Sequence, residues 1–291
     1  MFPQFPAQRL SSARFLSMLP SQMKIHPSAI VHPQAQVDSS VVIGPFSVVD
    51  PGVEIGANTV VGPHVHLTGI TRIGSGNRFH AGCVIGDSPQ DLKYADAPTR
   101  LVIGDNNVFR EHTTVHRSNS LEENTTIGSG NYLMAHSHVG HNSQVGDHVI
   151  MANGVLLGGH VTVGDRAILS GHSAVHQFVR IGTLAMAQGG SRLSVDLPPY
   201  TIGTGLNELC GLNTIGLRRA GFTQEQRTEL KRLYRELFFV RSRSSSDLKQ
   251  MLEAYPVGPA RVLIEFLTAS KRGFCSHRTR RTGSSETSAS T

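Results

Sequence analysis

Apolar residues recur at every sixth position of the chain from residue 25 to residue 193, and Asp91 is the one polar residue in that series. Glycine often follows the apolar residue directly, as at Gly44 and Gly62. A period of six with one apolar residue and one turn-permitting residue is typical of hexapeptide β-helices. Each hexad then forms a short strand and a turn, with the apolar side chain pointing inward and the glycine relieving the turn. The pattern therefore predicts an all-β solenoid, a left-handed parallel β-helix, over residues 23–196.

Three hexads close one triangular coil of about 18 residues in such a fold. Successive coils stack at about the strand spacing of 4.7–4.9 Å. A single coil cannot bury its inner side chains, so stability is a sum over neighbouring coils. Because the interior is narrow, functional sites are expected on the outside of the prism.

Two polar stretches interrupt the repeat, over residues 87–101 and 117–126. The apolar series leaves and re-enters both stretches in phase. We therefore expect two loops that project from the prism without disturbing the coils. Insertions in solenoids often lie on the binding face.

The repeat fades after Leu193, and the segment Asp196–Tyr200, "DLPPY", marks a break. Thr223 and Gln226 then form a capping box ahead of a helical pattern. These signals predict a small helical domain over residues 197–273.

Two further features complete the C-terminal part. Ser246 is a candidate cap for a short helix, and Pro259 stands near the start of another helical pattern that ends before Gly273. The polar residues 274–291 predict a disordered tail.

Composition narrows the class of protein. The 291 residues include 30 glycines, 6% aromatic residues and no tryptophan, and the net charge is +6. The positive excess lies near the two ends, and no basic–aromatic alternation indicates nucleic-acid binding. Three widely spaced cysteines predict neither a disulfide framework nor a CxxC zinc site, and fit a reducing compartment. No apolar run reaches the roughly 18 residues that a membrane span needs.

The N-terminal residues 1–22 differ in composition from the rest of the chain. They contain arginines and serines but no acidic residue. This composition is typical of an organellar transit peptide rather than a secretory signal. It predicts targeting to the mitochondrial matrix, with the plastid or the cytoplasm as the alternatives.

Four of the fifteen histidines lie within Ala135–His148. His141, His160 and His176 follow one another at intervals close to the length of one coil, so all three could line one edge on successive coils. One interpretation is structural, with turn histidines bonded to backbone carbonyls. A second is metal binding by His138 and His141 with an imidazole from a neighbouring chain, as in β-helix carbonic anhydrases. The third is a general base that takes a proton from a hydroxyl group.

Five segments carry a more specific resemblance: Gln90–Arg100, Met134–Asp147, Gly158–Gly182, Asp196–Tyr200 and Gly211–Phe222. In this order they resemble the UDP-N-acetylglucosamine O-acyltransferase family, which opens lipid A synthesis. The resemblance covers about residues 23–273. It implies transfer of a 3-hydroxyacyl group from acyl carrier protein to the 3-hydroxyl of UDP-N-acetylglucosamine. Such chemistry needs a base, an oxyanion donor and positioning, so we expect no metal and no organic cofactor. Three-sided coils commonly assemble as trimers, so a homotrimer with sites between subunits is expected.

The resemblance also implies roles for individual residues. His141 matches the catalytic base and the backbone N–H of Gly159 matches the oxyanion donor. The expected substrate-binding residues are Gln90, Asp91 and Lys93 in the first loop, His138, His160, His176 and Gln177 around the sugar and diphosphate, Asn213 and Arg219 at the nucleotide or the phosphopantetheine arm, and Gly189 at a position that limits acyl length.

Four residues depart from the family pattern. Asn142 stands where aspartate is common, Ile215 where a carboxylate is usual, Ala220 where a second arginine is usual and Leu206 where a polar residue is usual. Two alternatives therefore stay open. One is a metal-dependent hydratase, which metal content would reveal, and the other is a catalytically inactive assembly subunit, which an assay of turnover would reveal.

Overall fold

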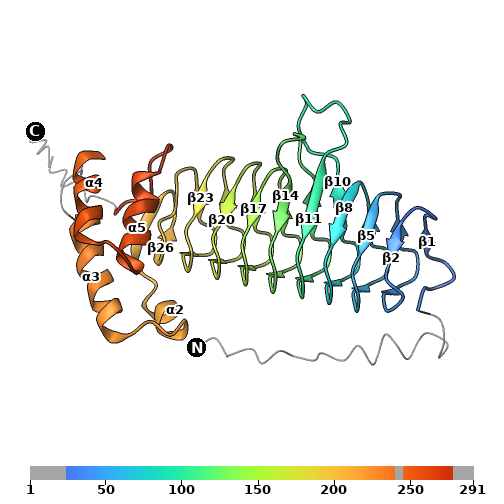
Figure 1. Cartoon of the computed structure of the whole chain (residues 1–291), viewed down its shortest axis with the longest axis horizontal. Coiled ribbons are helices and arrows are strands. Elements are labelled where there is room, and N and C mark those ends of the chain that lie inside the picture. The colour runs from blue at the N-terminus through green and yellow to red at the C-terminus, as the bar shows by residue number, and fades with distance from the viewer. Residues whose placement is uncertain (1–23, 240–244, 278–291) are drawn as a thin grey trace, which may run out of the picture.

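Short strands wind into a three-sided prism with a group of helices at its C-terminal end (Figure 1). The structure is a computed structural model and describes residues 24–239 and 245–277. Neighbouring strands along the prism are parallel, and the predicted left-handed parallel β-helix is confirmed. The predicted transit peptide at 1–22 lies outside the described residues.

Each side of the prism is one sheet. Sheet A contains β3 (Val42–Ile43), β6 (Val60–Val61), β9 (Arg78–Phe79), β12 (Val108–Phe109), β15 (Tyr132–Leu133), β18 (Ile150–Met151), β21 (Ile168–Leu169), β24 (Met186–Ala187), β26 (Thr201–Thr204) and β27 (Glu208–Leu212). Sheet B contains β1 (Ile30–Val31), β4 (Val48–Val49), β7 (His66–Leu67), β10 (Val84–Asp87), β13 (Thr114–His116), β16 (His138–Val139), β19 (Leu156–Leu157), β22 (Ala174–Val175) and β25 (Arg192–Leu193). Sheet C contains β2 (Gln36–Val37), β5 (Val53–Ile55), β8 (Ile70–Ile73), β11 (Arg100–Ile103), β14 (Thr125–Ile127), β17 (Gln144–Val145), β20 (Thr162–Val163) and β23 (Arg180–Ile181).

The chain passes from sheet B to sheet C, then to sheet A and back to sheet B. We name the three edges after the sheets they join: the A–B, B–C and C–A corners. Outside the two loops the period-six side chains fill the interior, where the rings of Phe79 and Phe109 stack with centroids 4.7 Å apart. Ile25, at the open N-terminal end, is 40% exposed because no preceding coil covers it.

The two predicted loops leave the register of the coils intact. Along most of the prism a residue pairs with its counterpart three hexads later, as Val48 does with His66. Thr114 instead pairs with Val84, five hexads before it, and with His138, four hexads after it. The first loop thus adds two hexads and the second adds one, and both loops leave the prism at the B–C corner.

The glycines that directly follow an inward residue do not relieve the turn as predicted, except Gly86, whose φ is 88°. Gly62 and Gly140, which directly follow inward residues, are absent from the left-handed region of φ. A Cβ on Gly140 would lie 2.7 Å from the carbonyl carbon of Gly158 in the next coil. These glycines therefore permit close approach of neighbouring coils, and they do not relieve the turn.

The left-handed turn residue comes three positions after the inward residue instead, and it is often a histidine or an asparagine. At the A–B corner four histidines occupy this position: His64, His112, His136 and His172. We call them the A–B histidine column. All four are exposed, and the rings of His112 and His136 stack with centroids 5.2 Å apart. Histidine and asparagine tolerate positive φ better than most residues with a side chain.

The C-terminal part departs from the predicted boundaries at two places. β26 continues sheet A in parallel with β24, so the prism runs past residue 196 before β27 turns back antiparallel. The predicted disorder of residues 274–277 is wrong, because Cys275 is fully buried and its N–H donates to the carbonyl of Asp196. The Ser276 carbonyl accepts the N–H of Leu209. Residues 278–291 lie outside the described residues.

The helices are α2 (Thr214–Arg219), α3 (Gln224–Phe239), α4 (Ser245–Ala254) and α5 (Pro259–Thr268). The predicted capping box before α3 is confirmed: the Gln226 N–H donates to Thr223 Oγ1 at 3.3 Å, and the Thr223 N–H donates to Gln226 Oε1 at 2.9 Å. Pro259 begins α5 as predicted. Within the described residues, no helix has the length and apolar character that crossing a membrane requires.

Candidate active site

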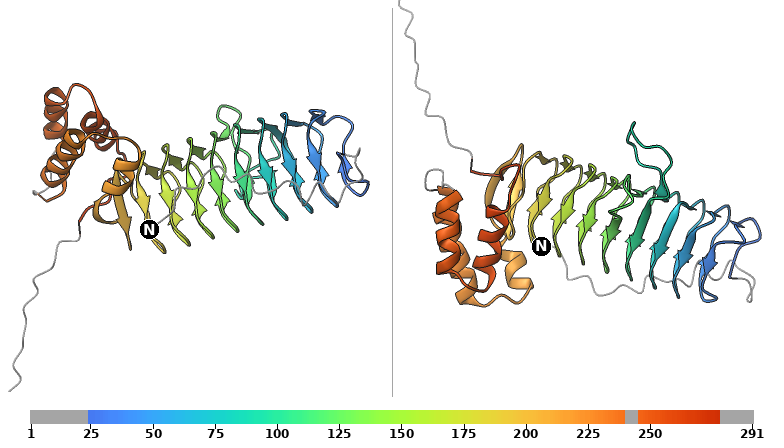
Figure 2. Two further views of the ribbon diagram at one scale, coloured as in Figure 1. Left: turned by 90° about the horizontal axis from the view of Figure 1, so that it is seen from below. Right: turned by 45° about the horizontal axis from the view of Figure 1, so that its top comes forward.

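A groove of about 800 Å³ runs over the outer face of sheet B beside the B–C corner. The two projecting loops rise from this same corner (Figure 2). The groove brings together six of the predicted site residues: Gln90, His138, His141, Gly159, His176 and Gln177. Its remaining lining is mostly apolar and includes Leu156, Ala174 and Leu206.

Three site residues form a column because they share one position in the hexad. His141, Gly159 and Gln177 each follow the inward residue by two positions, in three successive coils of the B–C corner. A Cβ on Gly159 would lie only 2.6 Å from His141 Nε2. The missing side chain therefore leaves space directly beside that nitrogen. Within the described chain, the Gly159 N–H has no hydrogen-bond acceptor.

Hydrogen bonds define which nitrogen of His141 carries the proton. His141 Nδ1 lies 2.9 Å from the Oδ1 atom of Asn142. The backbone N–H of Asn119 donates to the same Oδ1 at 2.9 Å, which identifies that atom as the amide oxygen. An oxygen only accepts, so Nδ1 of a neutral His141 is the donor and Nε2 keeps the lone pair. The atom that can accept a proton thus faces the space beside Gly159.

The second loop holds Asn142 in place. Asn142 is 3% exposed, and its N–H donates to Thr125 Oγ1 at 2.7 Å. Its Nδ2 lies 3.4 Å from a carboxylate oxygen of Glu123. Asn119 ties the loops together, because its Nδ2 donates to Asp91 Oδ2 at 2.8 Å. The Lys93 backbone N–H and the Asn119 amide hold the pKa of Asp91 below its usual value.

The histidines beside His141 favour the neutral form. Burial, reinforced by His116 and His141, lowers the pKa of His138 to about 4. Thr114 Oγ1 lies 2.8 Å from His138 Nδ1, and burial also lowers the pKa of His116. His160 contacts His141 edge-on, with ring centroids 5.2 Å apart, and burial foremost lowers its pKa. His116, His138 and His160 therefore favour the neutral form near pH 7.

The metal hypothesis gains no support from a single chain. Among the described residues there is no group of three or more His, Cys, Asp or Glu side chains arranged to hold a metal ion. His138 Nδ1 is engaged with Thr114. A site completed by a neighbouring chain stays a prediction, which metal analysis of the purified protein would test.

Six predicted site residues lie outside the groove lining: Asp91, Lys93, His160, Gly189, Asn213 and Arg219. Lys93 stands in the projecting loop, and Gly189 is at the A–B corner, where its Cβ position faces the Gly171 carbonyl oxygen. Asn213 is the N-cap of α2: its Oδ1 accepts the Gly216 N–H and its Nδ2 donates to the Leu184 carbonyl, each at 2.9 Å.

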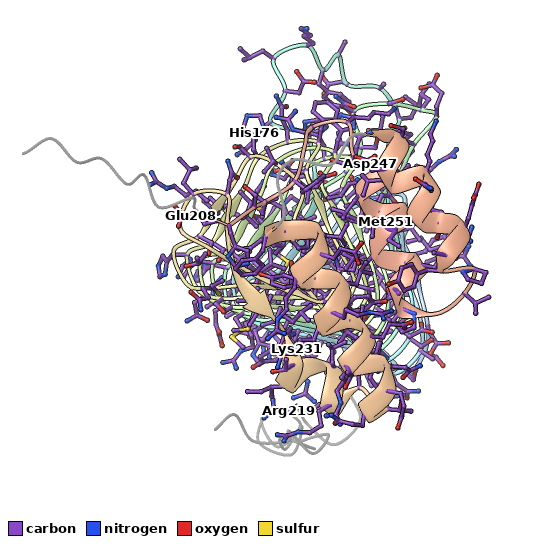
Figure 3. All side chains as sticks on the ribbon, turned by 90° about the vertical axis from the view of Figure 1, so that its left-hand side faces the viewer. His176, Glu208, Arg219, Lys231, Asp247 and Met251 are labelled. Atoms are coloured by element: carbon purple, nitrogen blue, oxygen red, sulfur yellow. The ribbon has the colours of Figure 1, made fainter. Side chains whose placement is uncertain are left out.

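Arg219 is the last residue of α2. In the view down the prism axis it lies on the opposite side of the molecule from His176 (Figure 3). A single chain therefore does not bring Gly189, Asn213 or Arg219 to His141. His160 lies behind His141 rather than in the groove lining, between that ring and Phe178, with which it stacks at a centroid distance of 4.5 Å.

The sequence interpretation missed two basic residues, one in the groove lining and one that contacts it. Arg192 is exposed in the lining, on the same outward row of sheet B as His138. Arg272 Nη2 lies 3.4 Å from His176 Nδ1, and its Nε donates to the Ser194 carbonyl at 3.3 Å. Counting hexads along this row could have revealed Arg192, whereas Arg272 arrives from the C-terminal segment and has no such signal.

Comparison with known proteins agrees with this architecture. Residues 196–275 match the family described as UDP N-acetylglucosamine O-acyltransferase, domain 2, and residues 34–69 and 124–159 match the bacterial transferase hexapeptide family. The acyl-[acyl-carrier-protein]–UDP-N-acetylglucosamine O-acyltransferase of Myxococcus xanthus is 45% identical over 86% of this chain and 98% of its own length. That of Burkholderia orbicola is 44% identical over the same shares.

Solved structures agree as well. The Francisella novicida UDP-N-acetylglucosamine acyltransferase superimposes with a TM-score of 0.82 at 36% identity, covering 87% of this chain and 94% of the other. The Arabidopsis UDP-N-acetylglucosamine acyltransferase gives a TM-score of 0.75 at 34% identity, covering 87% and 100%. The similarity thus extends over the prism and the C-terminal helices together.

Proposed function

Since the chain belongs to the family of acyl-[acyl-carrier-protein]–UDP-N-acetylglucosamine O-acyltransferases, we propose that it carries out that reaction. It transfers a 3-hydroxyacyl group from acyl carrier protein to the 3-hydroxyl of UDP-N-acetylglucosamine, as the first step of lipid A synthesis. The observation that carries the proposal is the juxtaposition of His141 Nε2 with the open space beside Gly159.

His141 acts as the general base. Its Nε2 takes the proton of the sugar 3-hydroxyl while the oxygen attacks the thioester carbonyl carbon. The Gly159 N–H, which has no acceptor within the described chain, donates to the developing oxyanion. One such donor is typically worth about 3–4 kcal/mol in the transition state. When the carbon–sulfur bond breaks, the imidazolium returns the proton to the departing phosphopantetheine thiolate, and His141 is neutral again.

The rest of the groove binds the substrates. The side chains of His138, His176 and Gln177 face the sugar and its diphosphate, and the exposed guanidinium of Arg192 supplies a positive charge for the phosphates. The apolar lining around Leu156 and Leu206 accepts the acyl chain. Every step uses side chains, backbone N–H groups and substrate atoms, so the chemistry requires neither a metal nor an organic cofactor.

We further propose that the enzyme is a homotrimer in which neighbouring chains complete each site. The outer face of sheet A supports this, because most of its outward side chains are apolar: Val42, Val60, Val108, Ile150, Ile168 and Met186, with Arg78 and Tyr132 in the same row. The same face of sheet C is mostly polar, with Gln36, Glu54, Arg72 and Thr162 in a row that also holds Val102. Gly189, Asn213 and Arg219 reach a groove only if a neighbouring chain presents them there.

Light scattering with gel filtration tests the trimer. Wild type is expected at three times the mass of one chain. Ile150→Glu places a charge on the apolar face and is expected to shift the protein toward the single-chain mass, whereas Gln36→Glu on sheet C is not. A wild-type protein with the mass of one chain would contradict the trimer.

The location of the protein is a separate proposal. The composition of residues 1–22 supports import into an organelle, the mitochondrion in the first place. A fusion of this segment to a fluorescent reporter is expected to enter mitochondria. Plastid fluorescence would redirect the proposal, and cytosolic fluorescence would reject it.

An acyl-transfer assay tests the activity. The purified chain is supplied with UDP-N-acetylglucosamine and a panel of 3-hydroxyacyl carrier proteins, and the acylated sugar nucleotide is measured by mass spectrometry. Product from at least one carrier supports the proposal. No product from any carrier would favour the inactive assembly subunit, or the metal-dependent hydratase if the protein also contains stoichiometric zinc.

A further inference from the structure

The residue beside the base is a neutral amide, and a carboxylate stands behind it. Asn142 contacts His141 Nδ1 directly, and Glu123 contacts Asn142. We propose that Glu123 is a positioning residue for His141 that acts through the Asn142 amide. The proposal rests on the acyltransferase function proposed above and adds a residue to its machinery.

Both ends of the Asn142 amide are fixed by the second loop. The oxygen accepts the Asn119 N–H at 2.9 Å, and the nitrogen lies 3.4 Å from the Glu123 carboxylate. A carboxylate only accepts hydrogen bonds, so it selects the orientation in which Nδ2 points to the loop and Oδ1 points to His141. That orientation places the proton on Nδ1 and leaves Nε2 free to act as the base. Without Glu123, one of the two contacts that define the amide orientation is lost.

The negative charge of the Glu123 carboxylate also acts on His141 through the intervening Asn142 amide. During the reaction His141 becomes an imidazolium, and negative charge along the hydrogen-bonded row Glu123–Asn142–His141 stabilises that state. Glu123 also lies 3.8 Å from Nδ1 of His160, whose ring contacts His141. Within the part of the chain that the structure describes, Asp91, His116 and His138 also interact electrostatically with His141. Of all these neighbours, Asp91 and Glu123 are the two negative ones.

This arrangement explains why an amide rather than a second carboxylate suits position 142. An aspartate there would bring two carboxylates to about the 3.4 Å that now separates Asn142 Nδ2 from Glu123. Like charges at that distance disfavour ionisation of both groups. A single carboxylate, at position 123 or at position 142, is therefore more favourable than two.

Glu123→Gln is the first test, with Glu122→Gln as its matched control. Glu122 lies in the same loop, and the contacts of its carboxylate are with Ser120. Removal of the negative charge at residue 123 makes the imidazolium form of His141 less stable during the reaction. We therefore expect Glu123→Gln to lower kcat by about three- to tenfold, with little change in KM for the sugar nucleotide. The acidic limb of the kcat/KM profile should move to lower pH, since the base then loses its proton more easily. Glu122→Gln should leave both unchanged.

The charge swap is the second test. Asn142→Asp alone, with two adjacent carboxylates, should move the acidic limb to higher pH. The double variant Glu123→Gln with Asn142→Asp should return kcat and the limb toward wild type, and circular dichroism should show that every variant is folded. Wild-type kcat and an unmoved acidic limb in Glu123→Gln would overturn the proposal while the wild-type enzyme remains active. An inactive wild type would instead reject the proposed function.

Discussion

The A–B and B–C corners of the prism contain the same residue type and use it in different ways. In the A–B histidine column, imidazoles sit three positions after the inward residue, where the backbone is left-handed and the rings are exposed. At the B–C corner His141 sits two positions after the inward residue, with its ring between Asn142 and the space beside Gly159. One step along the hexad thus separates the histidines of the left-handed turns from His141, to which we assign the role of base.

Substitution of His141 should give the largest contrast between the corners. His141→Ala removes the proton acceptor and is expected to reduce kcat by at least about 10²-fold, in the range of general-base catalysis. His136→Asn in the A–B histidine column keeps a residue that tolerates positive φ and should leave kcat unchanged. Steady-state acyl transfer by both variants measures the contrast. Equal activity of wild type and His141→Ala would remove His141 from the role of base.

The glycines of the two corners offer a steric test. Gly159 and Gly171 occupy the same hexad position, and neither has positive φ. An alanine Cβ at Gly159 would lie 2.6 Å from His141 Nε2, whereas at Gly171 the nearest atom is 3.4 Å away. The added Cβ would push the His141 ring away from its reactive position, and small displacements of a catalytic group slow the reaction strongly. Gly159→Ala should therefore lower kcat by about 10- to 100-fold. Gly171→Ala should retain activity, and similar losses in both variants would indicate a general effect on the coils.

Substitutions in the A–B histidine column should change the stability of the protein rather than its activity. A β-branched residue is strained at positive φ, so His136→Val is expected to cost about 1–2 kcal/mol of folding free energy. His136→Asn should stay within about 0.5 kcal/mol of wild type. Thermal unfolding measures the difference, and kcat should be unaffected by either change. A His136→Val protein as stable as wild type would show that the turn does not need a residue tolerant of positive φ.

A separate effect is expected in the pH dependence of stability. The pKa of His138 is about 4 in the folded chain, against a reference value of 6.5. Between these values the unfolded chain binds the proton and the folded chain does not, so stability falls as pH falls from 6.5 to 4. His138→Gln removes this contribution and should flatten the decrease in melting temperature across that window. An unchanged slope would mean that His138 is solvated in the folded protein.

The sequence predicts the scaffold far better than the site. Period six specifies the inward residues, and the unbroken phase across residues 87–101 and 117–126 identified both loops. The role of Gly62 was misjudged, because a Cβ there would lie 2.7 Å from the carbonyl oxygen of Phe79, which is brought beside it only when the chain has folded. Arg272 and Cys275 were unpredictable for a related reason: they contact the prism across large sequence separations and follow no repeat.

The site residues also divide into those that the repeat predicts and those that it does not. His138 and His141 follow from counting hexads, because position within the hexad and position on the corner are equivalent. The Glu123 contact with Asn142 depends on how an irregular loop closes, which no period encodes. The resemblance assigned Asn213 to the substrate, whereas within one chain the structure uses both ends of its amide to cap α2.

The insertion of both loops as whole hexads has a consequence for how such a protein can diversify. Every coil beyond an insertion keeps its inward residues inward, so a loop can be replaced, lengthened by a further hexad or exchanged between relatives as a cassette. The scaffold tolerates such exchanges because its folding information is local and repeated. New substrate preferences can therefore arise at one corner by recombination of loops, while the rest of the gene stays under unchanged selection for stability.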